Sequence, residues 1–88
     1  MKLMILILGD EVAEEALRDL IEREFRVTRV ASTGGFLRRG NTTLLIGTQD
    51  ERVDDALEVI RRVQKAHVGE HKPRATVFVL EMEHFEQL

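Results

Sequence analysis

The order of two helix-type segments among four β-type runs constrains the fold of this chain more than any other feature. Apolar residues recur at helical spacing from about residue 11 to 24 and again from Val53 to Val63, with charged residues on the opposite faces. The β-type runs lie at residues 3–8, 26–32, 42–47 and 75–81. The resulting order, βαββαβ, predicts an α+β, ferredoxin-like sandwich with both helices on one face of the sheet.

Residues that typically cap helices stand before both helical segments. Asp10 follows a glycine and is predicted to be the N-cap of the first helix. For the second helix, either Thr48 forms a capping box or Asp50 is the cap. Residues 65–74 are then predicted to be a mostly polar connector to the last strand.

Charged residues on the first helix are interpreted as a solvated outer face. Glu14–Arg18 and Asp19–Arg23 have the spacing and orientation of favourable i,i+4 ion pairs on a helix. We therefore expect these charges to support the helix locally.

Alternation in the second strand divides its side chains between two faces: Arg26, Thr28, Val30 and Ser32 on one, and Val27, Arg29 and Ala31 on the other. With both helices on one side, the other side of the sheet would expose apolar residues in a monomer. Such a patch normally marks an interface, so we expect an oligomer.

Composition limits the class of protein. The 88 residues are predicted to form one small domain over residues 1–88, and 43% hydrophobic with 33% charged residues is typical of a soluble globular chain. A net charge of −3 argues against binding to a nucleic-acid polymer. The apolar residues 1–8 are too short to span a bilayer and lack a cleavage pattern, and there is no cysteine. These features predict a cytoplasmic protein without a membrane partner.

Residues 31–43 hold three of the six glycines, one of the four phenylalanines and two adjacent arginines. Glycines allow a ligand to approach the backbone closely, and successive free N–H groups can bind an anion. Phe36 offers a flat apolar face, and Arg38 and Arg39 offer positive charge. A nucleotide would use all of these groups. The alternative is an ordinary connection between two strands, with Phe36 folded onto the core.

Patterns for catalysis are largely missing, so we expect no enzyme, no catalytic residues and no cofactor. The sequence has no cysteine nucleophile, no nucleophile elbow and no P-loop. The sequence from His67 to His71 fits a His-x-x-Glu-His metal motif, which requires a helix. Gly69 within it and Pro73 after it make a continuous helix doubtful, so no metal site is predicted.

The glycine-rich stretch and its surroundings resemble the PII-like cyclic di-AMP receptor family. The resemblance rests on Phe25-Arg26-Val27-Thr28, on Thr-Gly-Gly-Phe-Leu-Arg-Arg-Gly-Asn-Thr-Thr at residues 33–43, on residues 50–54 and on residues 75–80. It covers almost the whole chain. It implies a ferredoxin-like, PII-like subunit in a homotrimer, with a non-catalytic ligand site at each subunit boundary.

The resemblance also implies which residues bind the ligand. Thr28 and Asn41 match polar positions that meet an adenine, and Phe36 matches an aromatic that packs on the base. The other matching site positions are Arg26, Gly35, Leu37, Gly47 and, in a Phe-x-Gln ending, Gln87.

The chain departs from the family in two places. Family members commonly have a long Gly- and Pro-rich loop where this chain has only residues 65–74, which makes it a short-loop variant. Glu24 replaces a residue that is often uncharged and polar, and a carboxylate repels phosphates.

Two functions are therefore considered. The first is a trimeric signalling protein that binds cyclic di-AMP or another adenine nucleotide and acts on an unknown regulatory partner. The alternative is a protein–protein interaction module on the same scaffold that has lost nucleotide binding.

Overall fold

The computed structural model describes residues 1–30, 40–67, 75–84, 86 and 88. Within them the predicted order βαββαβ is confirmed, with one short 3₁₀ turn, η1, before the second helix. The elements are β1 (Lys2–Gly9), α1 (Asp10–Glu22), β2 (Arg26–Val30), β3 (Asn41–Thr48), η1 (Asp50–Arg52), α2 (Val53–His67) and β4 (Thr76–Glu81).

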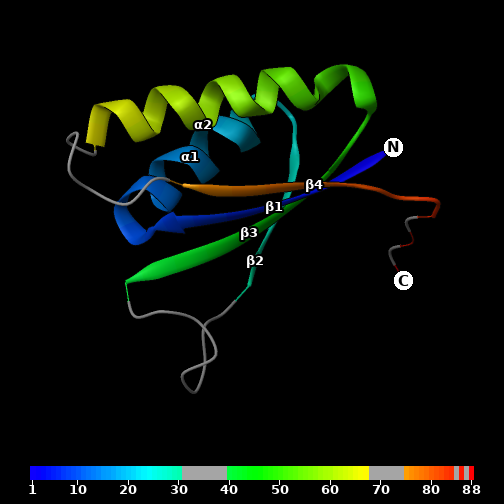
Figure 1. The fold of residues 1–88 in the computed structure, drawn as a ribbon, viewed down its shortest axis with the longest axis horizontal. Helices are drawn as coiled ribbons and strands as arrows, with labels where there is room; N and C mark the ends of the chain where they lie inside the picture. Colours follow the sequence, from blue (N-terminus) through cyan, green and yellow to red (C-terminus); the bar gives the residue numbers. More distant parts are fainter. Residues whose placement is uncertain (31–39, 68–74, 85, 87) are drawn as a thin grey trace.

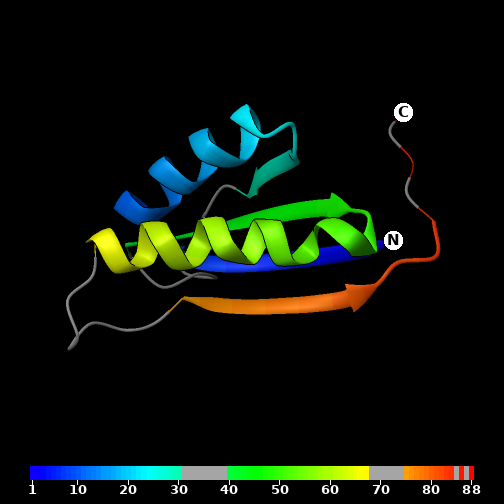
Figure 2. The same cartoon turned by 90° about the horizontal axis from the view of Figure 1, so that it is seen from above.

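The four strands form one antiparallel sheet in the order β2-β3-β1-β4. Both helices lie against the same face of this sheet (Figures 1 and 2). The α+β, ferredoxin-like fold predicted from the sequence is thus confirmed. We call the sheet face away from the helices the open face.

The core fills the layer between the helices and the sheet. Side chains that point to this layer alternate along each strand, as a half-buried sheet requires. The fully buried residues come from β1 (Met4, Leu6, Leu8), β3 (Leu44, Ile46) and both helices (Ala13, Ala16, Leu20, Ala56, Val59). The apolar stripes predicted for the helices are confirmed, except that Ile21 is 56% exposed. Ile21 is in the last turn of α1, where the neighbouring Leu20 is the residue that enters the core.

Helix α1 ends at Glu22, two residues earlier than predicted, because the chain turns at Glu24. Glu24 has a φ of 66°, in the left-handed region. Its N–H donates to the Ile21 carbonyl (2.9 Å), and the Phe25 N–H donates to the Leu20 carbonyl (2.9 Å). These two bonds are those of a Schellman motif, and Leu20 and Phe25 are both buried, as is usual beside such a motif.

The predicted helix caps are wrong. Gly9 is the N-cap of α1, and Asp10 is its first helical residue. The Asp10 carboxylate accepts a hydrogen bond from Thr42 Oγ1 (2.7 Å) on β3, and the helix has no side-chain cap bond. Before the second helix, neither Thr48 nor Asp50 is the N-cap. The 3₁₀ turn η1 precedes α2, and the N-cap of η1 is Gln49, which makes no side-chain cap bond.

Helix α2 continues to His67, so the connector predicted to begin at Lys65 begins later. Nothing in the sequence stops the helix before Gly69. At the other end of α2, the Arg52 guanidinium lies 3.9 Å from the centroid of the Phe25 ring and donates to the Arg23 carbonyl (2.7 Å). These contacts fix the start of β2 against the turn that precedes α2.

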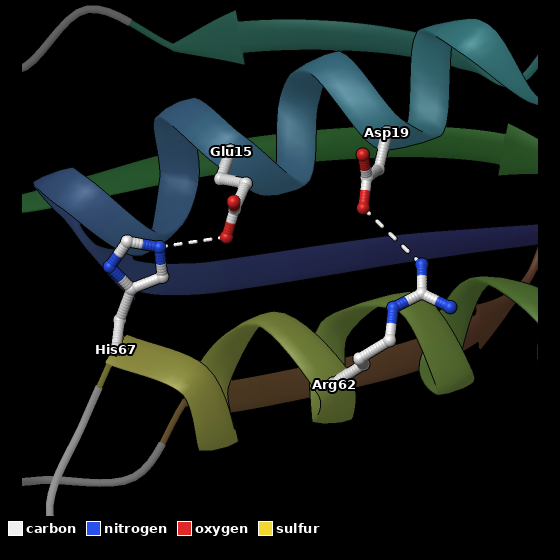
Figure 3. A network of polar contacts seen from close by, with 4 residues as sticks. All are labelled: Glu15, Asp19, Arg62 and His67. Atoms are coloured by element: carbon white, nitrogen blue, oxygen red, sulfur yellow. Dashed lines mark hydrogen bonds and ion pairs between the residues drawn. The ribbon is translucent and has the colours of Figure 1, made fainter.

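Charged residues of α1 pair with other elements and not within the helix. Arg29 on β2 contacts Glu14, and Arg62 on α2 lies 3.3 Å from Asp19. These tertiary pairs stand in place of the predicted pairs of Glu14 with Arg18 and of Asp19 with Arg23 within α1. His67 Nε2 also lies 2.7 Å from Glu15 Oε2, so two polar contacts join the facing sides of α1 and α2 (Figure 3).

Candidate functional site

The open face is made of rows of residues that run across the four strands. The register places Arg26, Gly47, Leu3 and Leu80 in one row; Thr28, Leu45, Ile5 and Phe78 in the next; and Val30, Thr43, Ile7 and Thr76 in the third. The first two rows are therefore polar at the β2 edge and apolar toward β1, whereas the third row begins with Val30 on β2 and carries threonines on β3 and β4.

Four of the predicted site residues are described, and all four lie on the open face. Arg26 and Thr28 are exposed on β2, and Gly47, opposite Arg26, is half-buried on β3. Asn41, also half-buried, has the same parity on β3 as Gly47 and stands opposite Gly9. The division of the second strand into two faces is confirmed over Arg26–Val30, since Val27 packs against the core and Arg29 contacts Glu14 on the helix side. Ala31 and Ser32 lie outside the described residues.

The start of β3 holds Asn41 in a fixed position. Gly40 has a φ of +88°, which L-residues rarely adopt. The Gly40 carbonyl accepts a hydrogen bond from the Asp10 N–H (2.9 Å), and the Thr42 hydroxyl donates to the Asp10 carboxylate. Asn41 lies between these two bonds, so the first turn of α1 positions it at the end of the glycine-rich stretch.

The remaining predicted site residues, Gly35, Phe36, Leu37 and Gln87, lie outside the described residues. So do Arg38 and Arg39 and the second histidine of the sequence motif, His71. Their roles stay predictions from the sequence.

Two partly exposed ion pairs lie at the end of the sheet where β1 begins and β4 ends. Lys2 is paired with Glu81 across β1 and β4, and the hydrogen bond that the Lys2 ammonium donates to the Glu81 carboxylate raises the pKa of Lys2. The amino group of Met1 lies 3.0 Å from the Asp50 carboxylate, and this contact lowers the pKa of Asp50. Lys2 and Glu81 have the same parity as the core residue Met4 and its partner Val79, so their side chains lie on the helix side of the sheet and not on the open face.

No cluster of three metal-ligating side chains occurs among the described residues. His67, the first histidine of the sequence motif, contacts Glu15 on α1 (Figure 3). This contact ties one helix to the other and is not by itself a site for a metal ion.

A groove of about 430 Å³ lies on the helix side of the sheet, between α2 and β4. Its lining residues are Leu57, Ile60, Arg61, Gln64, Lys65, Ala75 and Val77. Because Val77 has the opposite parity to Phe78, the groove and the open face are on different sides of the sheet. The groove is thus on the other side of the sheet from Arg26, Thr28, Asn41 and Gly47, the four predicted ligand residues that the structure describes.

Thr43 is a polar residue of the open face that the sequence reasoning did not single out. Only 8% of it is exposed, and its hydroxyl has no hydrogen-bond partner among the described residues. Its parity with Asn41 is the only sequence signal that places it on the same face.

Comparison with known proteins supports both the fold and the family. A protein of unknown function from Pediococcus pentosaceus has a similar crystal structure, with 37% identity, a TM-score of 0.77, and coverage of 99% of this chain and 96% of that one. A DUF3240 family protein from Shewanella baltica shares the fold at 18% identity and a TM-score of 0.70, over 99% of this chain and 94% of that one.

The sequence profile described as "cyclic-di-AMP receptor" matches residues 1–69. This range includes α1, α2, the first three strands and the whole glycine-rich stretch. The fold thus defines the chain as a ferredoxin-like α+β protein, and the profile makes the assignment specific: the chain belongs to the cyclic-di-AMP receptor family. No helix among the described residues is long and apolar enough to cross a membrane.

Proposed function

We propose that this chain is a non-catalytic, cytoplasmic receptor that binds cyclic di-AMP or a related adenine nucleotide as a homotrimer. Membership of the cyclic-di-AMP receptor family is the observation that carries the proposal. The position of Arg26, Thr28, Asn41 and Gly47 on the sheet face that neither described helix covers supports it.

In this proposal each predicted residue has a chemical role. Arg26 is exposed at the edge strand and supplies a positive charge for a phosphate. Thr28 and Asn41 supply donors and acceptors for the edge of the adenine. Gly47, opposite Arg26, adds no side chain to its row, which leaves space over the sheet for the ligand.

The residues of the loop and of the last segment complete the proposed site. Phe36 stacks on the base, and Gly35 and Leu37 contribute backbone near the ligand. Gln87 reaches the site at the subunit boundary. Because stacking on an aromatic ring does not distinguish one base from another, the selection of adenine falls to the polar groups of the sheet.

The apolar part of the open face supports a homotrimer. Phe78 is 50% exposed and Leu80 47% exposed on β4, and Leu3, Ile5 and Ile7 on β1 are only half-buried. Both described helices lie on the other side of the sheet (Figure 1). A face of this kind is stabilised when other subunits bury it, and a ligand on its β2 side then lies at a subunit boundary.

Calorimetric titration with cyclic di-AMP, cyclic di-GMP and ATP, combined with sedimentation equilibrium, tests this proposal. We expect saturable binding of an adenine nucleotide, one site per subunit, and a mass of three subunits. Since the chain has no Trp or Tyr, a nucleotide that copurifies is visible directly as purine absorbance. A trimer that binds none of the three nucleotides would favour the protein–protein interaction module, and a monomer would contradict the shared site.

A further inference from the structure

Thr43 carries a buried hydroxyl on the open face, where no described helix covers the sheet. Its exposed fraction is 8%, and Oγ1 has no hydrogen-bond partner among the residues that the structure describes. A buried hydroxyl normally has a partner, because an unpaired one has lost its bonds to water without replacement. Valine has the same shape and lacks the hydroxyl, so a threonine here works against the stability of the free subunit.

The position of Thr43 connects it to the proposed ligand site. It stands two residues from Asn41 on the same strand and face, a distance of about 7 Å at the usual rise of a strand. Thr28 is its diagonal neighbour on β2, and such neighbours are roughly 7–8 Å apart. Thr43 therefore lies between the two side chains that are proposed to meet the adenine.

We propose that the Thr43 hydroxyl contacts the ligand directly and pairs with a polar atom of the adenine. This inference rests on the proposed function and deepens it. A hydroxyl offers one donor and two acceptors, so it can pair with a ring nitrogen or with the amino group. The free subunit has already lost the hydration of this group, and the new bond to the ligand is therefore opposed by less desolvation than a bond to an exposed hydroxyl.

The substitution Thr43→Val tests the inference because it predicts two effects of opposite sign. The melting temperature of the ligand-free protein rises by several degrees, since an unpaired buried hydroxyl is removed. The affinity for cyclic di-AMP, measured by calorimetry, falls roughly three- to tenfold, the range expected for one lost hydrogen bond. Thr43→Ser keeps the hydroxyl and retains the affinity.

Thr76 offers a matched control in the same row of the open face. It is exposed, and Ile7 lies between it and Thr43. Thr76→Val makes the same chemical change with no buried hydroxyl involved, so it leaves both the melting temperature and the affinity unchanged. A general effect of apolar substitution on this face would alter both variants alike.

Three results would overturn the inference while the proposed function stands. An unchanged affinity in Thr43→Val shows that the hydroxyl does not contact the ligand. A lower melting temperature shows that the hydroxyl already has a partner in the free protein. Weaker binding together with a changed number of subunits, measured by sedimentation, assigns the hydroxyl to contacts between subunits. If the unaltered protein does not bind cyclic di-AMP, the proposed function itself fails, and this inference fails with it.

Discussion

Replacing Glu24 by glycine is expected to stabilise the protein. Glu24 occupies the left-handed position that follows the C-cap of α1, with a φ of 66°. For a residue with a Cβ this conformation costs about 1–2 kcal/mol, and glycine adopts it without that cost. Glycine also loses more backbone freedom on folding, which opposes the gain by about 0.4–1 kcal/mol. The net gain expected for Glu24→Gly is therefore about 1 kcal/mol, or roughly 4–8 °C in melting temperature for a domain of this size.

Thermal and urea unfolding, followed by circular dichroism at one fixed protein concentration, measure this gain. Two controls separate backbone strain from other causes. Glu24→Ala removes the carboxylate and keeps the strained conformation, so it gives no comparable gain. Arg23→Gly places glycine at the adjacent residue, whose φ is −88°, and is expected to destabilise by about 0.5–1 kcal/mol.

Two outcomes would refute the reasoning on Glu24. If Glu24→Ala stabilises as much as Glu24→Gly, the charge of Glu24 and not its backbone conformation is unfavourable. If Arg23→Gly also stabilises, the end of α1 gains from glycine for a reason unrelated to the sign of φ.

Three further predictions concern assembly, binding and pH. Ile5→Lys, on the open face, should give monomers in sedimentation experiments because it buries a charge in the proposed interface. The control Ile21→Lys, on the exposed side of α1, should leave the assembly intact. If both variants form trimers, the result argues against an interface on the open face. Phe36→Ala should weaken binding of cyclic di-AMP by about tenfold through loss of stacking, with unchanged circular dichroism; loss of soluble protein would instead place Phe36 in the core. Because the Lys2 pKa is raised above 10.5 by Glu81, this pair contributes stability that is present below pH 10.5 and is lost as the pH rises through the folded pKa. Glu81→Gln should therefore make the decline of the urea midpoint in this alkaline range less steep, and an identical decline in both proteins would show that the pair is not formed in solution.

The arrangement of the elements was predictable from the sequence, and their ends were not. Apolar spacing reveals which segments have a buried side, since that spacing follows directly from helix and strand geometry. The ends depend on contacts that are distant in the sequence. The Asp10 carboxylate accepts a hydrogen bond from Thr42 and does not cap α1. After α1 the chain turns at Glu24, in the left-handed conformation for which glycine is the usual residue.

The candidate site was predictable to a similar extent. The resemblance to the family identified Arg26, Thr28 and Asn41, and alternation placed Arg26 and Thr28 on one face. The pairing of β2 with β3, which sets Arg26 opposite Gly47, is a tertiary contact that no local pattern reveals. Thr43 was missed because burial of its hydroxyl depends on the surrounding strands, which the local sequence does not reveal.

The pairing of β1 with both β3 and β4 has a consequence for how the chain folds. Strand β1 lies inside the sheet, and its pair with β4 joins Lys2 to Glu81, which are 79 residues apart. A ribosome-bound chain that has not yet released β4 leaves one edge of β1 unpaired, with its apolar residues available to other nascent chains. Contacts of such long range also lower the folding rate. The four-stranded sheet can therefore form completely only after residues 76–81 have left the ribosome.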